Sequence, residues 1–173
     1  MTESSGYSSR YFLLHCARAT TQTRLSAKVL WIFALHEYEM KLHRVIVADD
    51  HDRMRSSIVA LLSERFQVVG AVSDGGELIQ CARCLLPDVI VSDIFMGGLG
   101  GILARDVLID QGVIIPFVFV SGLGKEIVSR VSNDSPVAFV YKVEMLDHLV
   151  NAMAAVLAGQ QYLSPYYGGY TKS

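Results

Sequence analysis

The stretch Val45-Ile46-Val47-Ala48-Asp49-Asp50-His51 decides the fold, because it joins a buried strand to two adjacent carboxylates. Four apolar residues, three of them β-branched, are typical of a central parallel strand that is covered on both faces. Asp49 and Asp50 follow where the strand meets its loop, and open α/β sheets bind their ligands at that carboxyl edge. Later apolar runs end in a similar way, on Asp93, Ser121 and Lys142. If the strands are parallel, these polar groups converge on one site.

Strand and helix patterns alternate from residue 44 onward. Apolar runs predict strands over 45–48, 67–72, 88–93, 114–120 and 137–141. Helical spacing and turn residues predict helices over 52–65, 77–86, 102–110, 125–131 and 144–158. The last helix is expected to turn a set of apolar residues inward: Leu146, Leu149, Val150, Met153 and Leu157.

This alternation predicts an α/β fold. We expect a five-stranded parallel sheet with helices on both faces and the flavodoxin-like strand order 2-1-3-4-5. The switch point of that order lies between the first and third strands. Because Asp49, Asp50 and Asp93 follow those two strands, the topology brings the three carboxylates together.

Composition excludes several functional classes. About half of the 173 residues are apolar (51%), and the net charge is −2 with scattered basic residues, so the electrostatic footprint of a nucleic-acid-binding protein is missing. Three cysteines indicate no disulfide framework and suit a reducing compartment. The apolar run Val29–Leu35 is shorter than the roughly 18 residues of a membrane span. We therefore expect a cytoplasmic protein with no membrane association.

Residues 1–39 differ in composition from the rest of the chain. They are rich in Ser, Thr and Arg up to Lys28, as organelle transit peptides are. A poorly ordered extension, or translation begun upstream of the true start, is the favoured interpretation, because Met40 leads straight into the first strand. The expected organisation is an N-terminal extension over 1–39, a domain over 40–163 and a C-terminal tail over 164–173.

The predicted site has the groups needed to capture a phosphoryl group. Asp49, Asp50 and Asp93 would repel one another and raise one another's pKa, and a hard cation such as Mg²⁺ removes that conflict. Lys142 adds a positive charge that can pair with an anion, and Ser121 adds a hydroxyl donor. A carboxylate nucleophile beside a metal and a lysine can accept a transferring phosphoryl group.

At these residues the chain resembles the receiver domain of two-component response regulators, over residues 43–165. The motifs that carry the resemblance are 45–51, Asp93-Ile94-Phe95-Met96, Ser121-Gly122 and Val140-Tyr141-Lys142. The Asp-Asp-His triplet and the segment Gly159-Gln160-Gln161-Tyr162-Leu163-Ser164-Pro165 resemble the LuxR/FixJ-type subfamily.

The resemblance implies a role for each acidic position. Asp93 would be the phosphoacceptor. Asp50 and Asp93 would bind Mg²⁺ through their side chains, Asp49 would assist through water, and the backbone carbonyl of Phe95 would complete the protein ligands.

The resemblance also implies a conformational switch. Ser121 would hydrogen-bond the phosphoryl group and draw in the loop after the fourth strand, and Lys142 would pair with a phosphoryl oxygen. Phe139 stands at the aromatic switch position, and simple core packing is an equally good interpretation of it. The readout face would involve the fourth and fifth helices and the fifth strand.

The chain departs from the family pattern in two places. Met96-Gly97-Gly98-Leu99-Gly100-Gly101 stands where the family usually has Met-Pro-x-Met-Asp-Gly, and the glycines predict a loop with more conformational freedom. Members of the subfamily normally continue into a helix-turn-helix, but eight residues follow Pro165. We therefore expect no direct DNA binding by this chain.

The expected function is a phosphorylatable receiver in a two-component phosphorelay, not an enzyme. Its partners would be a sensor histidine kinase or a phosphotransfer protein, with a second copy of the chain as a possible homodimer partner. A phosphatase of the haloacid dehalogenase class is disfavoured, because Phe95 stands where that class needs its second aspartate. The remaining alternative is a non-phosphorylated receiver-like scaffold that serves as an interaction module.

Overall fold

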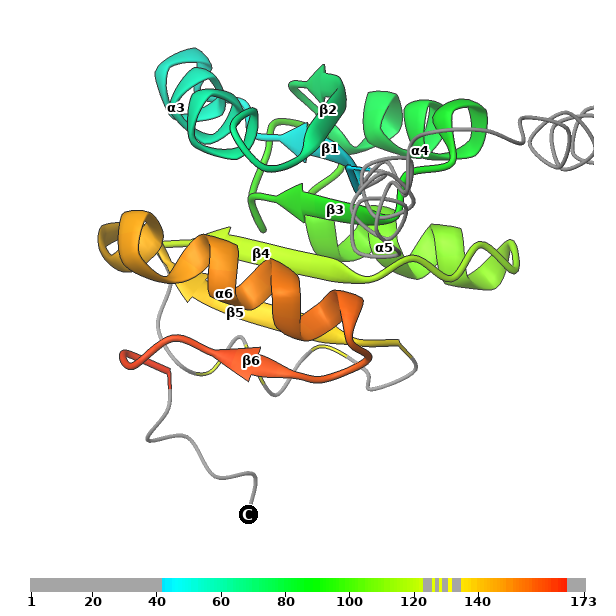
Figure 1. Ribbon diagram of the computed structural model, residues 1–173. Helices are drawn as coiled ribbons and strands as arrows, with labels where there is room; N and C mark the ends of the chain where they lie inside the picture. Colours follow the sequence, from blue (N-terminus) through cyan, green and yellow to red (C-terminus); the bar gives the residue numbers. More distant parts are fainter. Residues whose placement is uncertain (1–41, 123–125, 127, 129–130, 132–134, 168–173) are drawn as a thin grey trace, which may run out of the picture. The chain divides into compact units, whose positions relative to one another are not determined.

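The structure is a computed structural model that describes residues 42–122, 126, 128, 131 and 135–167 (Figure 1). These residues belong to one compact unit of the chain, which begins at Leu42. The predicted extension over 1–39 lies outside the described residues. Most of the helix expected over 125–131 also lies outside them.

Six parallel strands form one sheet in the order β2-β1-β3-β4-β5-β6. Their bounds are β1 Arg44–Ala48, β2 Gln67–Val72, β3 Val89–Ser92, β4 Phe117–Ser121, β5 Val137–Tyr141 and β6 Tyr162–Leu163. The parallel sheet and the order 2-1-3-4-5 are confirmed, and β6 is an additional strand that was not predicted. Its two residues are too few to show a strand pattern.

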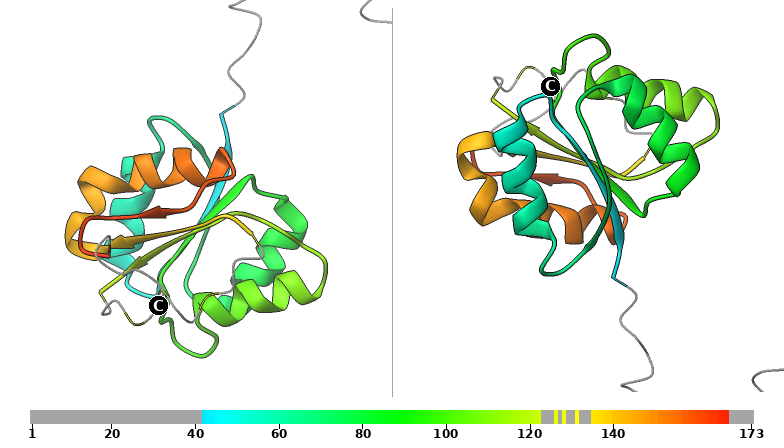
Figure 2. Two further views of the ribbon diagram at one scale, coloured as in Figure 1. Left: turned by 90° about the horizontal axis from the view of Figure 1, so that it is seen from below. Right: turned by 90° about the horizontal axis from the view of Figure 1, so that it is seen from above.

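Helices cover both faces of the sheet, as predicted. Their bounds are α3 Asp52–Leu62, α4 Gly75–Leu85, α5 Gly101–Asp110, the 3-10 turn η2 Lys142–Glu144 and α6 Met145–Leu157. In both views of Figure 2, α3 and α6 lie on one face of the sheet, and α4 and α5 lie on the other. Within the described part of the chain, no helix combines the length and the apolar character needed to cross a membrane.

The alternation of side chains along β1 explains the two cores of the domain. Val45 and Val47 pack in the core under α3 and α6, and Ile46 and Ala48 pack in the core under α4 and α5. All four residues are fully buried. A strand that is buried on both faces must be apolar at every position, which is why its sequence is a continuous apolar run.

Helix α6 buries a slightly different face from the one predicted. Leu149 and Met153 are fully buried, but Leu146 is 71% exposed, so its predicted inward orientation is wrong. The buried face runs through Met145, Leu149, Ala152, Met153 and Val156. Leu146, at the start of α6, falls outside that stripe.

The packed unit continues past residue 163, the predicted end of the domain. Strand β6 pairs with β5 through Ala138–Tyr162 and Phe139–Leu163. Beyond it, Ser164 and Tyr167 are both fully buried. The start of the predicted tail is therefore part of the core.

Candidate functional site

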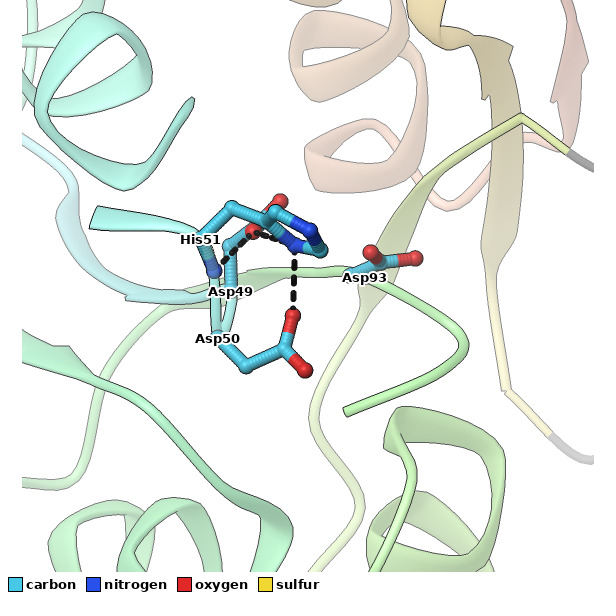
Figure 3. A group of neighbouring side chains, drawn as sticks. All are labelled: Asp49, Asp50, His51 and Asp93. Atoms are coloured by element: carbon cyan, nitrogen blue, oxygen red, sulfur yellow. Dashed lines mark hydrogen bonds and ion pairs between the residues drawn. The ribbon is translucent and has the colours of Figure 1, made fainter. Parts of the chain in front are cut away.

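Asp49 and Asp93 lie side by side at the carboxyl edge of the sheet. The register of β1 and β3 pairs Ala48 with Ser92, so the residue after each strand stands at the same level. The backbone N–H of Asp93 donates to the Ala48 carbonyl at 2.8 Å, which extends the ladder past the strand end. Asp49, Asp50, His51 and Asp93 each offer a ligand atom within 4.8 Å of the others (Figure 3).

Lys142 connects two of these carboxylates from the end of β5. Its Nζ lies 2.6 Å from Asp93 Oδ2 and 3.2 Å from Asp49 Oδ2. Burial by itself would lower the pKa of Lys142, but its hydrogen bonds and the charges of Asp93 and Asp49 outweigh burial and raise it above the usual value. Lys142 is therefore a cation at neutral pH.

Asp49 is fully buried, and its carboxylate is held from two sides. Oδ1 accepts the backbone N–H of His51 at 2.8 Å, and Oδ2 faces Lys142. A buried carboxylate needs such partners, because an unpaired buried charge is costly.

Asp50 lies nearer the solvent and connects to the loop after β3. Its Oδ2 accepts the backbone N–H of Gly97 at 3.2 Å, and its Oδ1 lies 2.7 Å from His51 Nδ1. Figure 3 shows the His51 ring placed between the carboxylates of Asp49 and Asp50. The contact between Asp50 and Gly97 joins segments that are 47 residues apart in the sequence.

Asp93 is nearly buried, at 6% exposure, and its carboxylate is anchored on both oxygens. Oδ1 accepts the backbone N–H of Phe95 at 3.3 Å, and Oδ2 faces Lys142. The Phe95 side chain is 62% exposed, while its backbone lies beside the acidic group. The clustered carboxylates are hard oxygen donors, which is the ligand chemistry that Mg²⁺ prefers, so these residues fit that ion.

Ser121 and Phe139, the predicted switch residues, lie inside the core on neighbouring strands. Ser121 ends β4 and is 1% exposed, and Phe139 in β5 is 2% exposed. The ring of Phe139 lies 5.5 Å from that of Phe119 and 6.1 Å from that of Tyr167, measured between centroids.

Tyr167 was missed by the sequence analysis, although it contacts both predicted switch residues, Ser121 and Phe139. Its hydroxyl donates to the backbone carbonyl of Ser121 at 3.4 Å. The available signal was the pair Tyr166-Tyr167 shortly after Tyr162-Leu163, since aromatic residues are expected to pack rather than to form a solvated tail.

Glycines in the loop after Asp93 serve close packing. A Cβ at Gly100 would meet the carbonyl oxygen of Ile94 at 2.5 Å, and a Cβ at Gly101 would overlap the carbonyl oxygen of Asp93 and the hydroxyl of Ser92. The N–H of Gly101 donates to the Ile94 carbonyl at 3.0 Å. The far end of this loop is therefore packed against the phosphoacceptor candidate, and glycine is required there for space.

Comparison with known proteins gives one consistent match. Residues 45–154 match the response regulator receiver domain family. The response regulator GacA of Pseudomonas aeruginosa is 34% identical over 125 residues, which are 70% of this chain and 58% of that protein. The chain thus spans a little under three-fifths of the length of this curated relative.

Solved structures share the same fold. A LuxR-family two-component response regulator from Aurantimonas sp. SI85-9A1 matches with a TM-score of 0.67 and 26% identity, covering 74% of this chain and 94% of that one. The isolated receiver domain of RcsB from Salmonella enterica serovar Typhimurium, solved with the phosphomimetic BeF₃⁻, matches with a TM-score of 0.64 and 22% identity. That match covers 74% of this chain and 97% of the RcsB domain.

Proposed function

Because the chain belongs to the response regulator receiver domain family, we propose that it accepts a phosphoryl group on Asp93 in a two-component phosphorelay. The observation that carries this proposal is the contact of Lys142 Nζ with Asp93 at 2.6 Å, inside a cluster of three carboxylates. That arrangement holds a nucleophilic oxygen beside a fixed positive charge.

The proposed transfer is a substitution at phosphorus. One carboxylate oxygen of Asp93 supplies the electron pair of the new O–P bond, and the P–N bond to the donor histidine breaks. The donor imidazole nitrogen keeps that electron pair and takes up a proton from solvent. The ammonium of Lys142 pairs with the phosphoryl oxygens, and its raised pKa keeps it charged for this role.

Asp49, Asp50, Asp93 and the backbone carbonyl of Phe95 are the residues that would hold Mg²⁺. When bound, the ion supplies positive charge next to the phosphoryl oxygens and relieves repulsion among the carboxylates. Around it, His51 and Gly97 orient Asp50, and Lys142 orients Asp49 and Asp93.

The proposed phosphoryl donor is a sensor histidine kinase or a phosphotransfer protein in the cytoplasm. Val143, the residue after Lys142, is 83% exposed, and Leu146, near the start of α6, is 71% exposed. We propose that these two exposed apolar side chains, which lie close to Lys142 in the chain, form part of the surface on which the donor protein docks to bring its phosphohistidine to Asp93. Output would pass through protein contacts, a homodimer among them.

Two alternatives are weaker. A non-phosphorylated scaffold has no need for a lysine held between two carboxylates, and that feature is present. A phosphatase of the haloacid dehalogenase class needs an aspartate at position 95, where this chain has Phe95.

Labelling with acetyl phosphate in the presence of Mg²⁺ tests the assignment. Intact-mass spectrometry should detect one phosphoryl group on the wild type and none on Asp93→Asn. Asp110→Asn, an exposed aspartate at the end of α5, is the matched control and should be labelled like the wild type. Equal labelling of Asp93→Asn would refute the phosphoacceptor, and an unlabelled but folded wild type would favour the scaffold.

A further inference from the structure

Residues 162–167, here called the C-terminal segment, wrap around the edge of the sheet. Strand β6 extends the sheet next to β5, and the Ser164 N–H then donates to the Phe139 carbonyl at 2.9 Å. The Ser164 hydroxyl accepts the N–H of Tyr141 at 3.1 Å, and the Tyr167 N–H donates to the Ser164 carbonyl at 2.8 Å. The segment is therefore fixed to the whole second half of β5.

This path carries Tyr167 onto the face of the sheet opposite α6. Tyr167 belongs to the core under α4 and α5, and it is fully buried. Its ring makes edge contacts with Phe139 and Tyr141, at centroid distances of 6.1 and 6.2 Å, and with Tyr166 at 5.2 Å. Three aromatic neighbours thus fix the direction of the Tyr167 hydroxyl.

That hydroxyl points at the end of β4. It donates to the Ser121 carbonyl at 3.4 Å. Burial is the main reason that the pKa of Tyr167 is raised to about 12. Tyr167 is therefore a protonated donor at neutral pH, and it engages the residue that should move when a phosphoryl group forms on Asp93.

We propose that Tyr167 is a positioning residue that holds Ser121 in its unphosphorylated arrangement and thereby couples the C-terminal segment to Asp93. This inference rests on the proposed function. Movement of Ser121 toward a phosphoryl group stretches or breaks the bond from Tyr167, so a phosphoryl group on Asp93 loosens the C-terminal segment. By reciprocity, removing the Tyr167 hydroxyl favours the phosphorylated arrangement.

A beryllofluoride titration of the full chain with Mg²⁺, followed by amide NMR, tests the coupling. Tyr167→Phe keeps the ring and removes the hydroxyl, and it should bind beryllofluoride about two- to ten-fold more tightly than the wild type, the range expected for one hydrogen bond. Tyr162→Phe is the matched control. Tyr162 lies in the same segment, but its hydroxyl lies 2.6 Å from His148 of α6, and its side chain packs against the core under α3 and α6, on the other face of the sheet from Tyr167. The affinity of Tyr162→Phe should therefore match the wild type.

Amide hydrogen exchange of the wild type gives a second readout that needs no variant. Saturation with beryllofluoride should speed exchange at Ser164 and Tyr167, whose N–H groups hold the segment in place. The positioning role is overturned if the wild type binds beryllofluoride but exchange at Ser164 and Tyr167 is unchanged. It is also overturned if Tyr167→Phe binds beryllofluoride no more tightly than the wild type. Neither result affects the assignment of Asp93 as the phosphoacceptor. A wild type that does not bind beryllofluoride overturns the proposed function itself, and the coupling with it.

Discussion

Asp49, Asp50 and Asp93 place three carboxylates against the single ammonium of Lys142, so the site carries excess negative charge at neutral pH. Carboxylates whose oxygens lie within 4.8 Å of one another repel and so destabilise the folded chain. This loss of stability is tolerated because the same groups attract a cation. Function and stability are therefore opposed at the scale of single residues.

Asp50→Asn should separate these two effects. It removes one negative charge while an amide can still bond Gly97 and His51, so the metal-free protein should become more stable by up to about 1 kcal/mol at low salt. Its stabilisation by added Mg²⁺ should be largely lost. Urea unfolding with and without Mg²⁺ measures both quantities, with Asp110→Asn as control. A less stable metal-free Asp50→Asn would contradict the repulsion argument.

Tyr167 should give stability a dependence on alkaline pH. Its folded pKa of about 12 lies above the unfolded value of about 10, so the folded state keeps a proton that the unfolded state loses. The contribution is fully present below pH 10 and disappears as pH rises toward 12. Stability measured by urea unfolding at pH 9, 10.5 and 11.5 should fall less steeply in Tyr167→Phe than in the wild type. An equally steep fall of stability with pH in both proteins would show that folding does not raise the pKa of Tyr167.

At the scale of elements, the junction between the glycine loop and α5 admits no added methyl group. Gly101→Ala should cost about 1 to 3 kcal/mol, because its Cβ overlaps the carbonyl of Asp93 and the hydroxyl of Ser92, and the backbone must shift. Phosphorylation should slow as Asp93 is displaced. Gly97→Ala is the matched control in the same loop, since its Cβ meets nothing within 4 Å. Chemical denaturation and acetyl phosphate labelling of both variants compare them, and equal stabilities would refute the packing argument.

The elements that could be predicted are those whose burial imposes a pattern. Strands β1 and β3 are buried on both faces, so their apolar runs and the carboxylates after them were evident in the sequence. Strand β6 was not evident in the sequence, because a strand of two residues is too short to show an alternating pattern. The place of Tyr167 depends on how the chain turns around the edge of the sheet, which is a tertiary property that no local pattern encodes.

At the scale of the whole molecule, the described core belongs to the compact unit that begins at Leu42. The buried residues of its two clusters lie between Val45 and Tyr167. We therefore expect a variant comprising residues 42–173 to fold cooperatively and to bind beryllofluoride with the affinity of the full chain. Thermal unfolding and the same NMR titration check this expectation. A loss of cooperative unfolding would show that the domain needs residues 1–41.

The short pairing of β6 with β5 also bears on how the protein behaves at high concentration. An uncovered β5 would present a flat apolar edge, and such edges recruit strands from other molecules and seed aggregates. Residues 162–164 occupy the middle of that edge. Any state that releases the C-terminal segment therefore exposes the unpaired edge of β5. A longer-lived released state should then make the protein aggregate sooner at high concentration.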